Sequence, residues 1–341
     1  MRNGLWIVAA IAVGCNSGGS AESAAGTTTT ATAATATTEP LTSGSGSVDT
    51  SNSVGSGAVG STTDAATSDE TSADDSTGTD AMPCNGAAAL CGRTYDAVVF
   101  PGTHNSVAAT ESGFSVLNAN QVRPVLGQLE DGIRVLLLDV TYDNGETVLC
   151  HGRCGLGSRS HVEVMTELHQ FLVEHPREVV TIIYQDSVDP SDVEADYVEV
   201  DLVGLTYTHR GGAWPTLGEM IDADTRLVVT AESQGPPPAW YHHVWDVAWD
   251  TPYTFTSVED FSCVLNRGET GHALMLMNHW LSNGVGLPDA AAAETSNAAE
   301  TLMDRVGECH REAGRLPTFI AVDFYETGDL FAVVDALNGV Q

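Results

Sequence analysis

Short apolar runs alternate with longer amphipathic stretches along most of this chain, beginning after about residue 84. The apolar runs have the length of strands, and they occupy residues 97–100, 133–140, 148–150, 179–184, 226–231, 273–277 and 318–324. Two of them, around 135–138 and 179–183, lack the alternation of a half-exposed strand. Such runs are typical of parallel strands that are buried on both faces.

The stretches between these strands have helical spacing. They occupy residues 161–175, 193–203, 217–221, 290–313 and 330–337. Pro215-Thr216 and Asp329 stand directly before two of them, where helix-starting residues are expected. Strands and helices that alternate over about 250 residues predict an α/β fold, an irregular TIM-type (β/α) barrel. No glycine-rich dinucleotide-binding turn follows a predicted strand, which argues against a doubly wound sheet.

The N-terminus has the features of an export signal. Arg2 precedes an apolar run at residues 5–13, which is too short to cross a bilayer but suits the core of a signal peptide. The segment Ala12-Val13-Gly14-Cys15 resembles the bacterial lipobox. We therefore expect a lipoprotein signal over 1–15, acylation of Cys15, and export to the bacterial cell envelope as a lipid-anchored or secreted protein. The alternative is an ordinary secretory signal with an unrelated cysteine.

Residues 16–83 are dominated by Thr, Ser, Ala, Gly and Asp and contain no Lys, Arg or aromatic residue. Such a segment buries too little apolar surface to offset its ordering entropy. We therefore expect a disordered acidic tether over 16–83, followed by one folded domain over 84–341.

Charge restricts the possible partners and chemistries. The chain has 46 Asp and Glu against 13 basic residues, all of them Arg, and its formal net charge is −33. An acidic surface without clustered cations argues against nucleic acid as a partner. The absence of Lys excludes Schiff-base chemistry and a P-loop lysine. The domain is expected to be a monomer.

Six cysteines follow Cys15, and in an exported protein an even set indicates disulfides. The expected pairs are Cys84–Cys91, Cys150–Cys154 and, by elimination, Cys263–Cys309. A metal site is the competing interpretation, because Cys150 and Cys154 flank His151 and bring three soft ligands together.

Polar residues gather where the predicted strands end. The positions concerned are His104-Asn105, Asp139, His151, Gln185-Asp186 and Asp323. In a barrel of parallel strands these ends share one rim, where such barrels carry out catalysis. Two histidines with carboxylates and amides at one mouth indicate general acid–base chemistry assisted by a hard cation.

These residues belong to motifs that resemble a known family. The motifs are Phe100-Pro101-Gly102-Thr103-His104-Asn105-Ser106, Asp131-Gly132-Ile133-Arg134 running to Leu138-Asp139, Leu149-Cys150-His151-Gly152, Pro215-Thr216-Leu217-Gly218-Glu219-Met220 and Val322-Asp323-Phe324-Tyr325-Glu326. Together they resemble the X domain of phosphatidylinositol-specific phospholipases C, over essentially residues 95–341. The resemblance implies an irregular TIM-type barrel that cleaves phosphodiesters with two histidines.

The resemblance also implies roles for individual residues. His104 corresponds to the general base that deprotonates the inositol 2-hydroxyl, whose attack on phosphorus gives a cyclic phosphodiester. His151 corresponds to the general acid that protonates the departing diacylglycerol oxygen, and the roles reverse when water opens the ring. Asp323 is expected either to orient His104 or only to cap the last strand.

Calcium is the implied cofactor. Counted from Gly132-Ile133-Arg134, Asp139 falls where calcium-dependent members place an aspartate and where other bacterial members place an arginine. Asn105 matches a ligand of the calcium-dependent members, and Gln185 or Asp186 falls near another. Leu137 and Gln185 stand where those enzymes carry glutamates, so the site presents fewer anionic ligands.

Two functions follow from this pattern. The first is a phospholipase-C-like phosphoric diester hydrolase or lyase acting on an inositol- or glycerol-type lipid or a related compound. The second is a non-catalytic surface lipoprotein that keeps the barrel as a binding module. Retention of both histidines favours the enzyme. The acidic domain is repelled by anionic membranes, which favours a soluble or neutral substrate. The aromatic cluster Trp240-Tyr241-His242-His243 is expected on a loop, where it contacts a lipid surface, lines the substrate cleft or simply packs.

Overall fold

The computed structural model describes residues 82–340, and these fall within one compact unit. The predicted signal peptide, Cys15 and almost all of the predicted tether lie outside the described residues. None of the described helices is long and apolar enough to cross a membrane.

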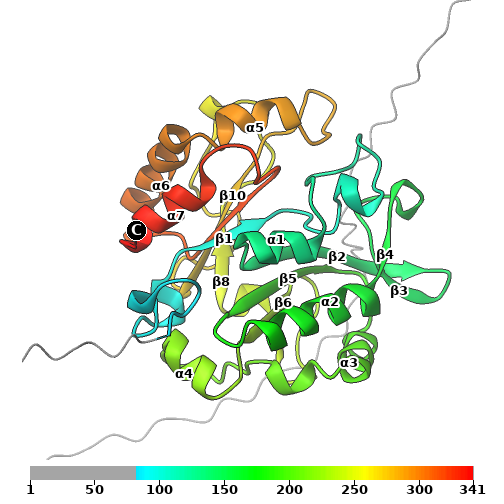
Figure 1. Ribbon diagram of the computed structural model, residues 1–341. Coiled ribbons are helices and arrows are strands. Elements are labelled where there is room, and N and C mark those ends of the chain that lie inside the picture. Colours follow the sequence, from blue (N-terminus) through cyan, green and yellow to red (C-terminus); the bar gives the residue numbers. More distant parts are fainter. Residues whose placement is uncertain (1–81, 341) are drawn as a thin grey trace, which may run out of the picture. The chain divides into compact units, whose positions relative to one another are not determined.

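A curled sheet forms the centre of the domain (Figure 1). Its parallel strands are β1 (Phe100–Thr103), β2 (Val135–Asp143), β5 (Val180–Asp186), β6 (Leu227–Ala231), β7 (Tyr241–His243), β8 (Ala248–Asp250), β10 (Leu274–His279) and β11 (Phe319–Val322). They pair in the order β7-β6-β5-β2-β1-β11-β10-β8. Neighbours in this order follow one another in the sequence, with β11 returning beside β1, as in a (β/α) barrel.

The barrel has one seam. No pairing joins β7 to β8 within residues 82–340, so the sheet curls around without closing. The predicted fold class, an irregular TIM-type α/β barrel, is therefore confirmed, and its irregularity lies at this seam. The pattern of apolar runs missed β7 and β8, because each is only three residues long.

Three short antiparallel strands extend the sheet: β3 (Glu146–Leu149), β4 (Arg159–Ser160) and β9 (Arg267–Gly268). β3 folds back on the extended end of β2 through Asn144 and Gly145, both at positive φ, as a tight hairpin turn requires. This arm projects from the barrel in Figure 1. It carries the chain from the end of β2 to His151, which follows β3 closely.

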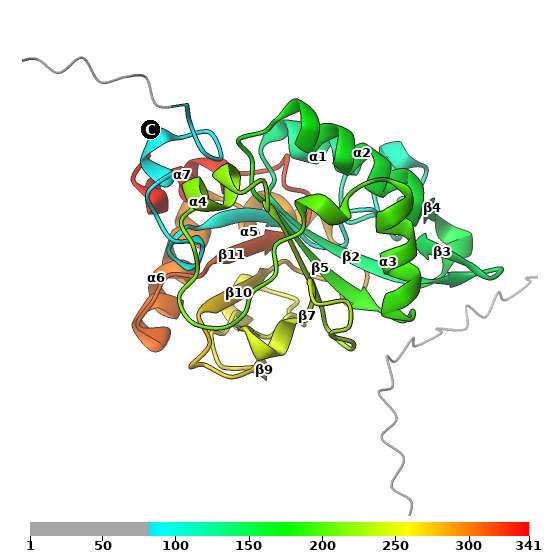
Figure 2. The ribbon, with the colours of Figure 1, turned by 90° about the horizontal axis from the view of Figure 1, so that it is seen from below.

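Helices cover the outer face of the sheet (Figure 2). They are α1 (Val125–Asp131), α2 (His161–Glu174), α3 (Pro190–Glu199), α4 (Leu217–Asp222), α5 (Ala290–Ser296), α6 (Ala299–Ala313) and α7 (Leu330–Asn338). Thr216 and Glu219 form a capping box that starts α4, as the sequence predicts. The helix predicted over 290–313 is two helices, because the chain turns at Asn297, whose amide bonds to the backbone carbonyl of Asp323.

Side chains alternate between two apolar clusters across the sheet. Leu137 and Ile183 point inward to a cluster that fills the barrel, whereas Leu138 and Tyr184 point outward against the helices. The aromatic segment predicted as a loop is in part a strand. Trp240 lies in the turn before β7, whereas Tyr241 belongs to β7. Both side chains are buried in the outward cluster, as the packed alternative predicts.

The N-terminal end of the barrel is plugged by the first residues of the domain. Leu90 and Tyr95 belong to the inward cluster, and the Tyr95 hydroxyl lies 2.5 Å from Thr181 Oγ1 at the start of β5. The disulfide Cys84–Cys91 closes this plug. Folding of the barrel core therefore involves the chain from about residue 84 onward.

The other two expected disulfides are also present in the structure. Cys263–Cys309 joins the β8–β9 segment to α6. Cys150–Cys154 closes the short loop that carries His151. Both thiols of the alternative metal site are consumed by this bond, so the structure favours the disulfide interpretation.

We expect limited proteolysis of the whole protein to leave a resistant fragment that begins near residue 82, because the plug seals the inward cluster. A fragment that begins after Tyr95 should be unstable, since it lacks the plug. Mass spectrometry of the trimmed product checks both expectations. Stable trimming past Cys91 would show that the plug is dispensable.

Candidate active site

Strand register brings two of the candidate catalytic residues side by side. In the parallel pairing, Thr103 on β1 lies opposite Val322 on β11, and Val322 lies opposite His279 on β10. The residues that directly follow Thr103, Val322 and His279 therefore lie at one level, on the rim formed by the carboxyl ends of the strands. Those residues are His104, Asp323 and Trp280.

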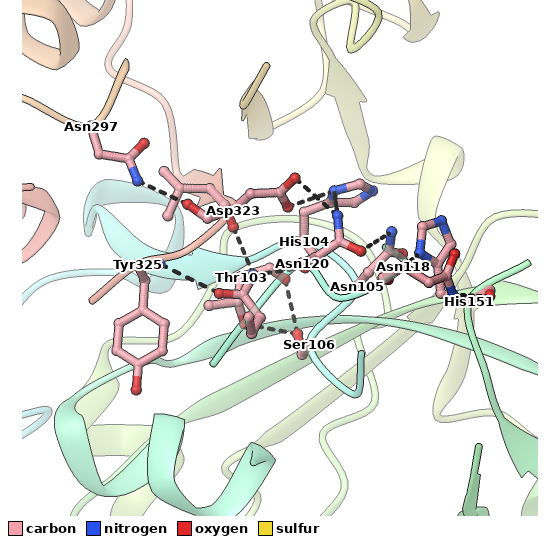
Figure 3. Close-up of polar contacts among 12 residues, drawn as sticks. Thr103, His104, Asn105, Ser106, Asn118, Asn120, His151, Asn297, Asp323 and Tyr325 are labelled. Atoms are coloured by element: carbon pink, nitrogen blue, oxygen red, sulfur yellow. Dashed lines mark hydrogen bonds and ion pairs between the residues drawn. The ribbon is translucent and has the colours of Figure 1, made fainter. Parts of the chain in front are cut away.

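His104 and Asp323 form a hydrogen-bonded pair at the rim (Figure 3). His104 Nδ1 lies 2.9 Å from Asp323 Oδ1, and the carboxylate is almost fully buried. The amide of Asn120 donates to the other carboxylate oxygen at 2.9 Å, which leaves Oδ1 for the histidine. Asn105 in turn donates to Asn120 Oδ1 at 3.2 Å. With Nδ1 held by a carboxylate, Nε2 of His104 is the ring nitrogen left for chemistry.

The backbone around this pair is equally fixed. The His104 amide donates to the carbonyl of Val322, and Gln121 Nε2 donates to the His104 carbonyl at 2.8 Å. The Asp323 carbonyl accepts from Asn297 at 2.8 Å. These contacts tie the ends of β1 and β11 to each other and to the loops that follow them.

His151 lies on the other side of His104. The two ring centroids are 6.3 Å apart, with the ring planes at 63°. Asn118 holds His151 from both ends, because its amide donates to the His151 carbonyl at 2.6 Å and its own carbonyl lies 3.2 Å from His151 Nδ1. The mouth thus presents two imidazoles from different chain segments, with Nε2 of each free of protein partners among residues 82–340.

Burial lowers the pKa of His151 below its ordinary value, and the positive charge of His104 lowers it further. The hydrogen bond with Asn118 and the charge of Asp323 act in the opposite direction and only partly compensate. The proton of His151 is therefore bound weakly, as suits a group that gives it away.

This shift predicts a pH dependence. If His151 must be protonated to act as acid, kcat/KM for a substrate with a poor leaving group should fall as pH rises through a value below the ordinary histidine pKa of about 6.5. For a nitrophenyl diester, whose leaving group departs without a proton, kcat/KM should not show this fall with pH. A pH profile of kcat/KM with both substrates makes the comparison. A fall that begins only above about pH 7.5 would contradict the depressed pKa.

Asp139 and Gln185 form the next level of the mouth. They lie opposite each other in the pairing of β2 with β5, on the face that carries Leu137. Burial raises the pKa of Asp139 to about 7, while the charge of His104 lowers it and that of Glu232 raises it. Within residues 82–340 no side chain or amide donates to this carboxylate. Asp139 is thus a half-buried acid at the mouth, without a hydrogen-bond donor among the described residues.

Asp186 is not brought to this cluster. It is adjacent to Gln185 on a strand and so points to the opposite face, where its carboxylate accepts from the amides of Ser233 and Gln234 at 2.8 and 3.1 Å. The Tyr241 hydroxyl lies 3.4 Å from the same carboxylate. Because these contacts occupy Asp186 outside the barrel, we remove it from the candidate metal ligands.

An ion-pair cluster that the sequence did not indicate lines the mouth near the seam. Arg267 lies 2.6 Å from Glu232 and 2.6 Å from Asp250, and Asn278 donates to Asp250 at 3.0 Å. The Arg267 guanidinium also stacks over Trp245, 4.3 Å from the ring centroid. Glu232 and Arg267 are partly exposed, so this arrangement presents both charges near the seam.

Three further site residues escaped sequence analysis: Asn118, Asn120 and Trp280. Each acts through a contact with a residue distant along the chain. Asn120 lies in a long loop without a motif of its own. Trp280 directly follows β10, and that position beyond a strand end was the one available signal.

Comparison with known families shows which family the chain belongs to. The family model described as PI-PLC X 1 matches residues 90–338. The chain belongs to the PI-PLC X domain family. The matched range includes both histidines and all of the barrel strands.

Relatives of this PI-PLC X domain protein occur in a fungus and a plant. An "Uncharacterized secreted protein" of Arthroderma benhamiae is 27% identical over a 293-residue alignment that covers 77% of this chain and 65% of the relative. The "PI-PLC X domain-containing protein 1" of the same fungus is 29% identical and is covered over 90% of its length. A PI-PLC X domain-containing protein of Arabidopsis thaliana is 29% identical, and the chain spans 55% of its length.

Solved structures agree on the fold. Two structures of the phosphatidylinositol-specific phospholipase C of Staphylococcus aureus, one of them of a variant, match 74% of this chain. Their TM-scores are 0.50 and 0.51, at 14% and 13% identity, and the match covers 95% and 94% of those chains. At this identity the likeness concerns the barrel architecture.

Proposed function

We propose that this PI-PLC X domain protein is a phospholipase-C-like phosphoric diester hydrolase or lyase that works with two histidines. The observation that carries the proposal is the pair of imidazoles across one mouth, one bonded to a buried carboxylate and the other held by Asn118 with a lowered pKa. Two groups with different environments are suited to opposite proton transfers.

In the proposed first step, His104 Nε2 takes the proton of a hydroxyl that neighbours the phosphodiester. That oxygen forms a bond to phosphorus while the bond from phosphorus to the leaving oxygen breaks, and His151 gives its proton to the leaving oxygen. Asp323 stabilises the His104 imidazolium and holds its Nδ1 proton. In the second step water replaces the alcohol: His151 takes its proton, and His104 protonates the ring oxygen as the cyclic diester opens.

The donor set at the mouth fits a hard cation. Asp139 supplies an uncompensated carboxylate, and Gln185 and Asn105 supply amide oxygens, which are ligands that Ca²⁺ accepts. Within residues 82–340 no group of three or more His, Cys, Asp and Glu side chains is placed to hold a metal, so the set depends on amides. A bound Ca²⁺ would neutralise charge on the phosphoryl group. With one carboxylate, its affinity should be low.

Asp139→Asn should raise the Ca²⁺ concentration needed for half-maximal activity by at least about tenfold, since it removes the only anionic ligand. Asp186→Asn is the matched control, because that neighbouring carboxylate faces away and should leave the Ca²⁺ requirement unchanged. Activity assays over a Ca²⁺ titration, beside thermal melts, provide the measurement. If neither added Ca²⁺ nor a chelator changes the activity of the wild-type protein, the proposed role of the cation is wrong.

The rim supports a lipid-type substrate. Exposed apolar side chains stand on loops that leave the carboxyl ends of the strands: Val116, Leu117, Leu156, Val264, Leu265 and Val285. Leu117 and Leu156 flank the His151 loop, since the Ser115 amide donates to the Leu156 carbonyl at 2.8 Å. Apolar side chains on an otherwise acidic protein favour contact with an uncharged lipid surface. Glu232 and Arg267, the partly exposed members of the ion-pair cluster, would bind a hydroxylated headgroup.

A panel of phosphodiesters tests this function. The full-length protein should cleave phosphatidylinositol or a glycerol phosphodiester in neutral detergent micelles faster than the same lipid in anionic vesicles. Failure to cleave any diester, together with tight binding of one of them, would instead support the binding module that lacks catalysis. The ordered pair of His104 and Asp323 favours the enzyme, because a binding module does not require a polarised base.

Export is the setting we propose for this activity. A relative is named as a secreted protein, and the disulfides suit an oxidising compartment. Acylation at Cys15 remains a prediction, because the residue lies outside the described part of the chain.

A further inference from the structure

An aromatic side chain lies flat against the proposed base. The Trp280 ring is parallel to His104 within 6°, with the ring centroids 3.7 Å apart. Trp280 is 6% exposed, and it belongs to the apolar cluster that fills the barrel. The pair is therefore in full van der Waals contact inside the mouth rather than an accidental contact at the surface.

Hydrogen bonds alone leave the His104 ring one free motion. The bond from Nδ1 to Asp323 fixes one ring atom, but the imidazole can still swing about that bond and move Nε2 out of the mouth. A flat surface against one face of the ring removes this motion. Trp280 is placed to supply that surface, because register puts it at the level of Asp323 and His104.

Hydrogen bonds of the preceding strand and a second aromatic ring fix the position of Trp280. The Asn278 amide donates to Thr251 Oγ1 at 3.0 Å, and the Asn278 carbonyl accepts from the buried Arg305 at 2.6 Å, which fixes the end of β10. Tyr253 is stacked beside Trp280, with centroids 6.4 Å apart and planes at 26°. Arg267 lies 5.0 Å over the Tyr253 ring. The position of the Trp280 ring against His104 therefore depends on contacts with the β8–β9 segment and with α6.

We propose that Trp280 is a positioning residue that fixes the plane of the His104 ring, so that Nε2 points at the hydroxyl to be deprotonated. The inference rests on the proposed role of His104 as base. Trp280 touches neither of the transferred protons nor phosphorus. Its effect on turnover arises from orientation, and a misplacement of about 1 Å in such a group costs about 10²-fold in rate.

Three variants test the proposal in the full-length protein. Trp280→Leu removes the flat face and should lower kcat by about 10²-fold while KM stays within about threefold. Trp280→Phe keeps a flat apolar face and should restore most of kcat. Trp214→Leu is the matched control: Trp214 is also buried and stacks on a histidine, His209, at 4.0 Å and 10°, but at the N-terminal end of the barrel. It should cause a similar loss of stability without loss of kcat.

A spectroscopic measurement reads the geometry without turnover. Ring protons of His104 should resonate upfield in the wild type because they lie over the Trp280 ring, and this displacement should vanish in Trp280→Leu but persist in Trp214→Leu. Wild-type kcat in Trp280→Leu, or an equal loss of kcat in Trp214→Leu, would overturn the proposal. If Trp280→Leu does not fold, Trp280→Phe carries the test through a smaller displacement with kcat retained.

The proposed function and the role of Trp280 can fail separately. A wild type that cleaves no diester would refute the proposed function, and the His104 resonances would then decide the geometric claim alone. Turnover that depends on His104, combined with unshifted His104 ring protons, would refute only the role of Trp280.

Discussion

His104→Ala should abolish turnover of every phosphodiester substrate, whatever its leaving group. The attacking hydroxyl must lose its proton in each case, and a general base typically contributes about 10²–10⁴ in rate. The protein should keep its fold, since His104 is partly exposed at the rim and its backbone bonds do not involve the ring. Initial rates with phosphatidylinositol and with a nitrophenyl diester, beside thermal melts, make the comparison.

His151→Ala distinguishes the acid from the base. It should be as severe as His104→Ala on the natural type of leaving group and far milder on the nitrophenyl diester, whose leaving group needs no proton. Equal losses on both substrates would remove the role of His151 as general acid. The side chain would then be better described as a phosphate ligand or as a structural part of the Cys150–Cys154 loop.

Asp323→Asn should lower kcat by about 10²–10⁴ with little change in KM. The amide is the same size as the carboxylate and can keep the contact with His104 Nδ1 at the present 2.9 Å, but it no longer stabilises the imidazolium and can favour the wrong tautomer. The oxygen of the new side-chain amide can still accept a hydrogen bond from Asn120, so this contact is not lost altogether.

Asp329→Asn provides the control for this variant. Asp329 is another acid of the C-terminal segment, and its carboxylate accepts from the backbone amide of Ala299 at the start of α6 rather than from a histidine. It should leave kcat unchanged. A kcat for Asp323→Asn within about threefold of wild type would show that Asp323 only ends β11 and does not serve His104.

The positions of His104 and Asp323 were accessible from sequence because each follows an apolar strand, and parallel strands end on one rim. His151 reaches the rim by another route. The strand before it, β3, is antiparallel and not a barrel strand, and it folds back along β2 until Leu149 lies opposite Val140. The partners of these residues were not accessible. Asn118 and Asn120 lie in one long loop, and their contacts with His151 and Asp323 arise only when that loop folds over the strand ends.

Position at a strand end could not show which of Gln185 and Asp186 faces the mouth. Adjacent residues on a strand point to opposite faces, so only one of two neighbouring candidates can face the mouth. The register of β5 with β2 decides that Gln185 lies beside Asp139. That register is set by packing across the whole sheet and not by the two residues themselves.

The seam of the barrel was hidden for a related reason. β7 and β8 are too short to produce a hydrophobic period, and the prolines at 236–238 before β7 suggested a loop. Similarly, the break between α5 and α6 depends on the bond from Asn297 to the Asp323 carbonyl, a contact made by the folded site. In these places tertiary structure overrides the local pattern.

The central claim is that the two histidines cleave a phosphodiester by attack of a neighbouring hydroxyl. ³¹P NMR of the full-length protein acting on phosphatidylinositol in neutral micelles tests it most directly, because a cyclic phosphodiester has its own resonance. We predict that this resonance appears with the wild type, is absent with His104→Ala, and is later replaced by that of the monoester. Loss of the phosphodiester signal at the same rate with His104→Ala, or no loss with the wild type, would contradict the account.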